Sequence, residues 1–187
     1  LVLLGVVVGG AIGAIAAKRV EMTKMPELVA FMHSMIGLAA VFIAIAAVVE
    51  PQSLGIVANL GDAIPAGNRL ELFLGAAIGA ITFSGSVIAF GKLQAKLPPA
   101  VENAIPGPLR GLVTTAMSSR PILLPARHLI NIVIAVAIFF LLDWFIYNES
   151  AFAFFAMTLL AFVIGFLLII PIGGADMPVV VSMLNSY

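Results

Sequence analysis

The sequence predicts an all-α protein, a polytopic bundle of transmembrane helices with five full spans and a sixth, partial one. Two totals favour this class, since 63% of the 187 residues are hydrophobic and only 10% are charged. A third observation is the length of the apolar segments, close to the roughly 20 residues that a helix needs to cross a hydrocarbon core about 30 Å thick. The spans are helices because a backbone in lipid must satisfy its own hydrogen bonds, and the sequence shows no alternation typical of barrel strands.

Polar residues separate the apolar segments. The expected spans are Leu1–Ala17, Leu28–Val49, Leu70–Phe90, Leu129–Tyr147 and Ala151–Ile172. The first lacks the basic region and cleavage site of a signal peptide, so we interpret it as a span. Met177–Tyr187 has about half the length of a span. We expect residues 1–187 to form one transmembrane domain, a fragment of a longer subunit, with a long loop at residues 91–127 whose centre could hold a short surface helix.

The basic residues indicate an orientation. All but one of the nine lie between the first and second spans or between the third and fourth, and only Arg69 lies on the other side. The positive-inside rule therefore predicts that residues 18–27 and 91–127 are cytoplasmic and that the N-terminus of the segment is outside. Trp144 and Tyr147, at the outer end of the fourth span, are typical of an aromatic belt at a membrane interface.

The composition excludes several classes of function. Formal neutrality argues against binding nucleic acid, and the absence of cysteine removes disulfides and thiolate metal sites. The two histidines lie at unrelated positions, so no metal site is expected. The sequence contains neither a phosphate-binding loop nor a dinucleotide fingerprint, and no nucleophile stands with a base. We therefore expect no nucleotide-binding site and no covalent catalysis on this chain.

Glycines follow helical spacing in two of the spans. Gly5, Gly9 and Gly13 stand four residues apart in the first span, and Gly75 and Gly79 repeat this spacing in the third. Such faces allow helix backbones to approach closely, and helix association in lipid depends on that packing. We expect these glycines to lie at helix contacts.

His33 shares a helical face with small residues of the second span. The residues in register with it are Ala30, Gly37, Ala40, Ala44 and Ala47. This face should turn toward other helices and away from lipid. In the third span Thr82 and Ser86 extend the glycine face with hydroxyl groups, so the two weakly polar faces could meet.

An imidazole within a span suggests proton transfer. An ionised group at mid-bilayer costs about 2.5–3.5 kcal/mol on insertion scales, so ionisable residues there usually face a protein interior or a wet cavity. A histidine titrates near neutral pH, which suits it to passing protons. The alternative is that His33 stays neutral and donates a hydrogen bond that serves packing alone.

Further polar residues lie near the ends of the spans. Glu27 follows Pro26 at a helix start, where a carboxylate is also favoured by the helix dipole. Glu71 opens the third span from the opposite side. Asn131 enters the fourth span beside His128 and needs a polar partner.

The final segment adds a possible hinge. Asp176 follows Gly173 and Gly174, and either a helix N-cap or a hinge explains this arrangement. Asn185 lies about two turns into the last segment and would be buried if that helix continues.

Four stretches resemble the membrane domain of the beta subunit of proton-translocating nicotinamide nucleotide transhydrogenases. They are AKRVEMTKMPELVAFMHSMIGLAAV, GAITFSGSVIAFGKL, LLPARH with Asn131 close behind, and GGADMPVVVSMLNSY. The last is the most specific. Two departures are that the loop at residues 97–120 is longer than in the family and that the chain ends at Tyr187, where the family continues through further helices to a nucleotide-binding domain.

The resemblance implies a division of labour. Soluble domains outside this chain would exchange a hydride between NADH and NADP+, while the membrane helices carry protons whose inward flow drives the exchange. The implied proton path consists of His33, Ser86, Asn131 and Asn185. The implied entrance, exit and coupling residues are Glu27, Glu71 and Asp176, with a hinge at Gly173 and Gly174.

The resemblance also implies cofactors, partners and a location. This segment itself would bind no cofactor, while NAD(H) and NADP(H) would bind to other domains of the complete enzyme. Its partners would be lipid, transmembrane helices of an alpha subunit and the two nucleotide-binding domains, in a homodimer in the bacterial plasma (inner) membrane. Two other functions stay open: a helical scaffold that anchors and dimerises soluble domains, and a small secondary transporter.

Overall fold

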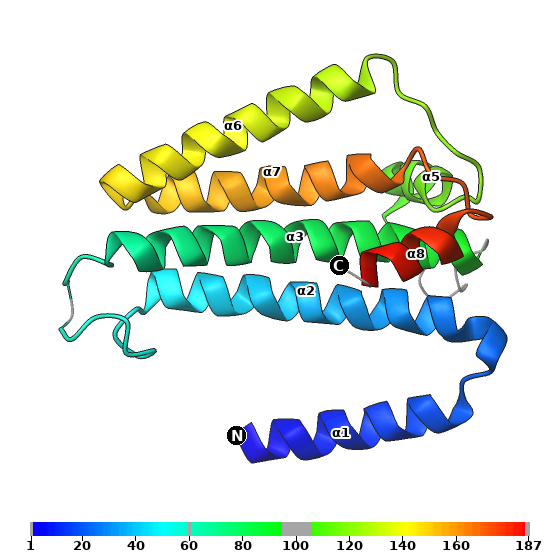
Figure 1. The fold of residues 1–187 in the computed structure, drawn as a ribbon, viewed down its shortest axis with the longest axis horizontal. Coiled ribbons are helices and arrows are strands. Elements are labelled where there is room, and N and C mark those ends of the chain that lie inside the picture. Colours follow the sequence, from blue (N-terminus) through cyan, green and yellow to red (C-terminus); the bar gives the residue numbers. More distant parts are fainter. Residues whose placement is uncertain (1, 60, 95–105, 186–187) are drawn as a thin grey trace.

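The computed structural model describes residues 2–59, 61–94 and 106–185, and this part of the chain is helical with no strand (Figure 1). Its long helices are α1 Val2–Arg19, α2 Met25–Val49, α3 Ala66–Gln94, α6 Arg127–Asn148 and α7 Ala151–Ile169. Its short helices are η1 Met22–Lys24, α5 Gly107–Ala116 and α8 Met177–Asn185. The five long helices are long and apolar enough to cross a membrane, which confirms the five predicted spans.

The helix ends differ from the predicted ones where local chemistry extends or stops a helix. α2 begins at Met25, because Pro26 fits the first turn of a helix. α7 starts at the N-cap Ser150, whose hydroxyl accepts a hydrogen bond from Ala153 N. It ends at Ile169 rather than Ile172, because Pro171 has no backbone N–H with which to continue the helical hydrogen bonds.

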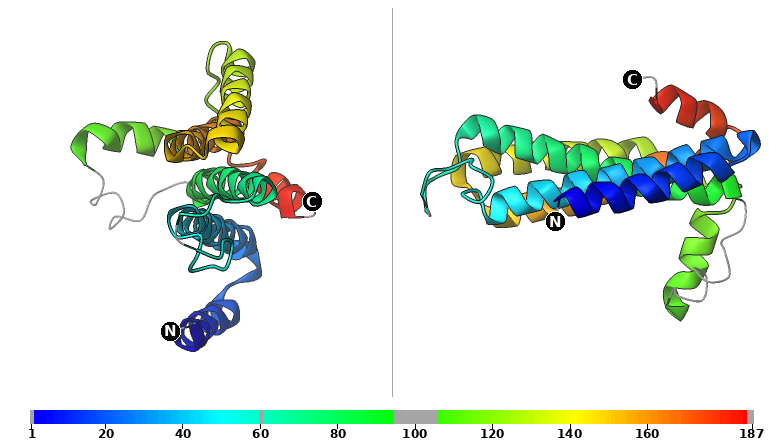
Figure 2. Two further views of the ribbon diagram at one scale, coloured as in Figure 1. Left: turned by 90° about the vertical axis from the view of Figure 1, so that its left-hand side faces the viewer. Right: turned by 90° about the horizontal axis from the view of Figure 1, so that it is seen from below.

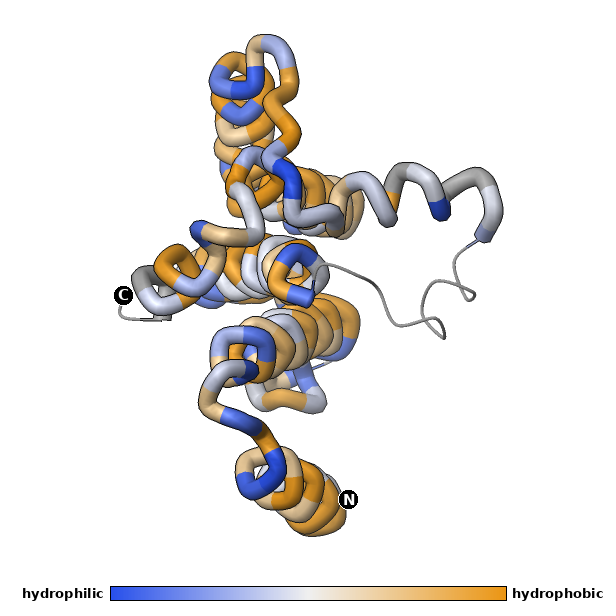
Figure 3. The backbone as a smooth tube through the Cα atoms, turned by 90° about the vertical axis from the view of Figure 1, so that its right-hand side faces the viewer, coloured by the Kyte–Doolittle hydropathy of each residue, from blue (hydrophilic) through white to orange (hydrophobic). Residues whose placement is uncertain are grey.

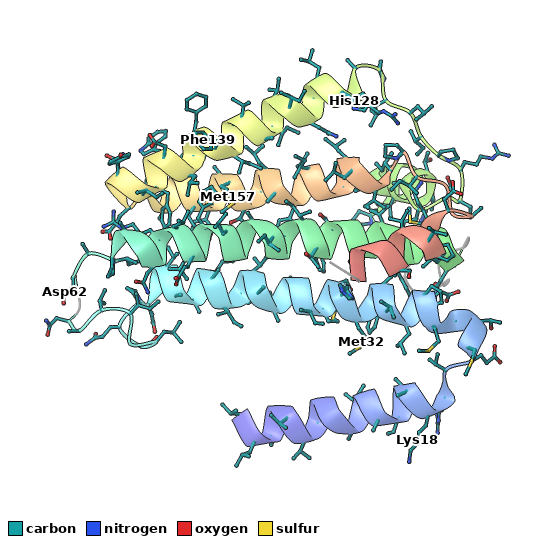
Figure 4. The ribbon with its side chains drawn as sticks, viewed as in Figure 1. Lys18, Met32, Asp62, His128, Phe139 and Met157 are labelled. Carbon is teal, nitrogen blue, oxygen red and sulfur yellow. The ribbon has the colours of Figure 1, made fainter. Side chains whose placement is uncertain are left out.

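Successive long helices run in alternating directions (Figure 1). The connections α1–α2, α3–α6 and α7–α8 therefore share one end of the bundle, which we call the basic end, and α2–α3 and α6–α7 share the other. Figure 4 places Lys18 and His128 at the basic end and Asp62 at the opposite end. Viewed from the basic end, Figure 3 shows mainly hydrophobic helices with hydrophilic residues gathered where the chain turns.

The packed unit consists of α2, α3, α7 and α6, in that spatial order (Figure 1). α1 lies apart from it and buries no residue. A Cβ atom added to Gly5, Gly9 or Gly13 would meet no atom within 4 Å. The close helix contact expected at these glycines is therefore not made with any described part of this chain.

The small-residue faces of α2 and α3 meet, as the sequence predicts. A Cβ atom on Gly37 would stand 2.7 Å from both Gly79 O and Phe83 N. A Cβ atom on Gly79 would stand 2.8 Å from Gly37 O. Both positions require glycine because backbone meets backbone there. Gly75 differs, since a Cβ atom there would meet nothing within 4 Å.

The other side of α3 packs against α7 in the same way. A Cβ atom on Gly165 would lie 2.6 Å from Ile81 O and 2.8 Å from Ile81 Cα. Ser84 also faces Gly165 and turns its hydroxyl back to Ala80 O at 2.9 Å, so its polar group is satisfied within its own helix. α3 is thus held tightly between α2 and α7.

An ion pair closes the end of the bundle opposite the basic end. Arg69 at the start of α3 lies 2.6 Å from Glu149 in the α6–α7 turn, and their side chains are 13% and 33% exposed. The guanidinium also donates to Ile64 O and Ile146 O. Glu149 Oε1 is buried and accepts no hydrogen bond of good geometry in the described residues, so Arg69 is its electrostatic compensation.

Replacing Arg69 with methionine is expected to lower the unfolding midpoint in detergent. The change leaves the Glu149 carboxylate partly buried without its cation, at a cost of about 1–2 kcal/mol after allowance for solvent screening. Thermal unfolding followed by circular dichroism measures the shift. The matched control is Lys24→Met, because Lys24 pairs with Glu21 at 3.6 Å through side chains that are 61% and 69% exposed. Equal shifts for the two variants would contradict this prediction.

A candidate proton site in a cavity between α2, α3, α7 and α8

His33 lies about two turns from the basic end of α2. Its Nδ1 stands 3.2 Å from Val29 O, one turn earlier. A carbonyl oxygen can only accept, so this contact assigns the proton to Nδ1. Nε2 is then the nitrogen that can take up a second proton. A hydrogen bond from Nδ1 to Val29 O favours this tautomer of the ring.

His33 lines a cavity of about 370 Å³. Its other lining residues come from four helices and the α7–α8 connection: Ala30, Ile81, Thr82, Gly85, Ser86, Ala89, Gly165, Leu168, Ile169, Ile172, Val180 and Val181. Among these described lining residues, only His33, Thr82 and Ser86 contribute polar side chains. Since one water molecule takes about 30 Å³ in the liquid, the cavity has room for several.

The polar side chains of the cavity share one depth in the bundle. His33 lies about two turns after the start of α2, and Ser86 lies about two turns before the end of the antiparallel α3. Thr82 follows one turn further in on the same face as Ser86. The structure therefore brings together His33 and Ser86, and it adds Thr82, which the sequence placed on the Ser86 face without a role.

Glu27 lies at the mouth of the bundle rather than in the cavity. Its Oε2 accepts a hydrogen bond of 3.4 Å from Gln94 Nε2 at the end of α3. The carboxylate is half-buried and belongs to the first turn of α2. Glu27 thus joins the ends of α2 and α3 on the side of the basic end.

Asn131 and Glu71 do not line the cavity. Asn131 is half-buried on α6, which packs mainly on α7, and Glu71 is exposed on the far half of α3. Asn185 is the last residue of α8, and its side chain lies outside what the structure describes. A contact of these residues with His33 therefore stays a prediction.

Of the two glycines in the α7–α8 connection, Gly174 packs against the end of α3, while a Cβ atom on Gly173 would lie 3.8 Å from Ser119 O and from Pro121 Cδ. Gly174 N donates to Ser119 O at 2.9 Å, and a Cβ atom on Gly174 would stand 2.7 Å from Lys92 O. Asp176 is exposed and its backbone oxygen accepts from Val180 N, which places it at the start of α8. Because Gly174 meets backbone so closely, the connection is a packed turn at this point and not a free loop.

Lys92 is the residue that sequence reasoning missed. Its side chain is only 1% exposed, and its ammonium donates to three backbone carbonyls. In the sequence it belongs to the basic residues that predict a cytoplasmic connection. A lysine at the end of a span contributes to this positive-inside pattern whether its side chain is exposed or buried. The neighbouring Gly91, which packs against Met117, was the only local indication of close packing.

No described group of three or more histidine, aspartate or glutamate side chains could hold a metal ion. Among the described residues that line the cavity, the imidazole is the only titratable group. A half-buried protonatable ring in a mostly apolar, partly open cavity, within a bundle of helices long enough to span a membrane, defines an integral membrane protein with a polar site between its helices.

Comparison with known proteins gives the family. The family model described as NAD(P) transhydrogenase beta subunit matches residues 1–187. Two NAD(P) transhydrogenase subunit beta sequences from Rhodospirillum rubrum are each 48% identical over 186 residues, covering 100% of this chain and 35% of the relative. The chain belongs to the NAD(P) transhydrogenase beta subunit family, which confirms the resemblance. It spans about a third of the length of these relatives.

Proposed function

We propose that residues 1–187 form the proton-translocating membrane domain of a nicotinamide nucleotide transhydrogenase. In this proposal inward proton movement is coupled to hydride transfer from NADH to NADP+ in soluble domains that are not on this chain. The observation that carries the proposal is the place of His33, which lines a partly open cavity between the helices together with Thr82 and Ser86. Membership of the beta-subunit family supports the same function.

The chemistry of the cavity suits proton transfer. With Nδ1 held by Val29 O, Nε2 takes up a proton and the ring becomes a cation. The hydroxyls of Thr82 and Ser86 both donate and accept, so they can orient water toward the ring. Asn131 and Asn185 are proposed as further polar neighbours of the path, and Glu27 and Glu71 as acidic residues on its two sides.

The energetic scale is adequate. One charge that crosses a potential of about 200 mV releases about 4.6 kcal/mol, at roughly 2.3 kcal/mol per 100 mV. Inverting a two-state equilibrium from 1:99 to 99:1 needs about 5.5 kcal/mol. A single proton therefore supplies most of such a switch. An open proton wire would dissipate the gradient, so His33 must communicate with one side at a time.

The proposal also includes the coupling of the helices to NADP(H) binding, and the partners and membrane that surround this segment. Asp176 and the hinge at Gly173 and Gly174 would transmit the state of a bound NADP(H) to the helices. Alpha-subunit helices and the nucleotide-binding domains would be the partners, in a homodimer in the bacterial plasma membrane. The exposed surface of α1 supports further helices or lipid beside it. The basic end would face the cytoplasm, with the loop at residues 91–127, and the N-terminus would face out.

The test is to reconstitute the complete protein in sealed vesicles and record hydride exchange and proton movement together. Proton translocation predicts that the internal pH changes during exchange and that a protonophore removes the change and alters the rate. A scaffold predicts exchange without any pH change, and this result would refute the proposal. A secondary transporter predicts solute uptake by the same vesicles without nucleotides. The described lining of the cavity is largely apolar and contains no aspartate, glutamate, lysine or arginine to bind a charged solute.

A further inference from the structure

Lys92 is a buried cation that has no role in the proposed proton path. The side chain lies at the end of α3 and is 1% exposed. Its Nζ donates to Ile172 O at 2.8 Å, to Ile170 O at 2.9 Å and to Arg120 O at 3.3 Å. An ammonium has three donors, so all of them are used.

The acceptors explain how the charge is tolerated. α7 ends at Ile169, so Ile170 O and Ile172 O lie just beyond the C-terminus of a helix, where the helix dipole favours a cation. No carboxylate pairs with Lys92 in the described ranges 2–59, 61–94 and 106–185. The lysine therefore binds backbone, and what it binds is the segment between α7 and α8.

Two more contacts join the same three segments, which are the end of α3, the segment after α5 and the α7–α8 connection. Ser119 Oγ donates to Lys92 O at 3.3 Å, and Ser119 O accepts from Gly174 N at 2.9 Å. We call Lys92, Ser119 and Gly174 with these contacts the latch. Figure 2 shows that α5 and α8 project to opposite sides of the bundle at this end. The latch lies at the segments that lead to these two helices.

The latch is continuous with the wall of the cavity. Ile172, which accepts from the Lys92 ammonium, also lines the cavity beside His33. Ser86 stands six residues before Lys92 on α3, less than two turns away. A movement of the α7–α8 connection away from α3 would break the bonds of Lys92 and open the cavity wall at Ile172 in one step.

We propose that Lys92 is a positioning residue for coupling: its ammonium holds the α7–α8 connection against α3, so that the hinge moves only together with the wall of the His33 cavity. This inference rests on the proposed function. Without the latch, the hinge between α7 and α8 can move with the soluble domains while the shape of the cavity does not change. Hydride exchange then continues, but fewer protons move for each hydride.

The experiment compares Lys92→Met, Lys92→Gln and Lys92→Arg with wild type in the complete protein reconstituted in vesicles. The readouts are the amount of assembled protein, the rate of hydride exchange and the number of protons moved per hydride. Lys92→Met is expected to keep exchange within about twofold and to lower the proton-to-hydride ratio at least fivefold. Lys92→Arg, which keeps a cation with several donors, is expected to restore more than half of the ratio. Lys24→Met, at an exposed lysine of the same end, is the control and should leave the ratio unchanged.

A support role without coupling gives a different result. In that case Lys92→Met lowers assembly and both activities in proportion, and the unchanged ratio overturns the inference. If Lys92→Met does not assemble, Lys92→Gln decides, since its amide keeps two donors without the charge: a lowered ratio supports the inference, and a wild-type ratio or a failure to assemble overturns it. A wild-type protein that moves no protons would instead refute the proposed function, so the two failures are distinguishable.

Discussion

Replacing His33 with alanine in the complete protein is expected to lower proton translocation about a hundredfold or more while the protein still assembles. The change removes the only titratable side chain among the described residues that line the cavity. General acid–base groups typically contribute factors of 10² to 10⁴, and the hydroxyls of Thr82 and Ser86 cannot replace an imidazole as the proton acceptor. The measurement is the pH change inside vesicles during hydride exchange, scaled to the amount of assembled protein.

His128→Ala is the matched control for this prediction. His128 is exposed at the start of α6, where its Nε2 accepts a hydrogen bond of 3.2 Å from Arg127 Nε, and it does not line the cavity. Its removal is expected to leave translocation within about twofold. Loss of translocation in both variants would contradict the prediction, because the effect would not be specific to the ring in the cavity. Normal translocation in His33→Ala would show that the ring serves packing alone.

The spans and their packing faces could be predicted from sequence because lipid imposes simple requirements. A length of about 20 apolar residues and small residues at four-residue spacing are visible in any single chain. The meeting of the α2 face around His33 with the α3 face around Ser86 followed from these patterns. The helix Gly107–Ala116 was only an option in the sequence, since prolines on either side of it are equally typical of a loop.

Spacing alone could not identify which glycines and which cations are buried. Gly75 and Gly79 stand four residues apart on the same face of α3, but only Gly79 meets the backbone of a neighbouring helix. The crossing of α2 over α3 decides where the two helices touch. Lys92 differs from the exposed Lys24 only in its surroundings, which consist of carbonyls far away in the sequence. Both features depend on tertiary packing, and a pattern along one helix does not contain that information.

The arrangement makes α3 the fixed element of the bundle. Arg69 holds one end to the α6–α7 turn, and Lys92 holds the other to the α7–α8 connection. Gly79 and Gly165 bring α2 and α7 within backbone contact on its two faces. Since His33 is on α2 and Ser86 on α3, the separation of these two helices sets the geometry of the cavity. The close contact at Gly79 should therefore control both stability and function.

Gly79→Val is accordingly expected to destabilise the protein by roughly 3 kcal/mol, the upper end of the range for overpacking. The new Cβ atom would stand 2.8 Å from Gly37 O and 3.0 Å from Ala40 Cβ, so α2 must move away from α3. Because a backbone oxygen cannot give way as a flexible side chain can, the shift reaches His33, about one turn before Gly37 on α2. Proton translocation should fall with stability, as measured by thermal unfolding in detergent and by the vesicle assay.

Gly75→Val provides the control on the same helix, since a Cβ atom there would meet nothing within 4 Å. It makes the same chemical change one turn away and is expected to stay within about 1 kcal/mol of wild type, because valine has a somewhat higher helix propensity than glycine. An equal loss of stability in Gly79→Val and Gly75→Val would show that the cost arises within α3 itself. A loss confined to Gly79→Val places it in the contact with α2, which is the contact that sets the distance between the imidazole and the hydroxyls of the cavity.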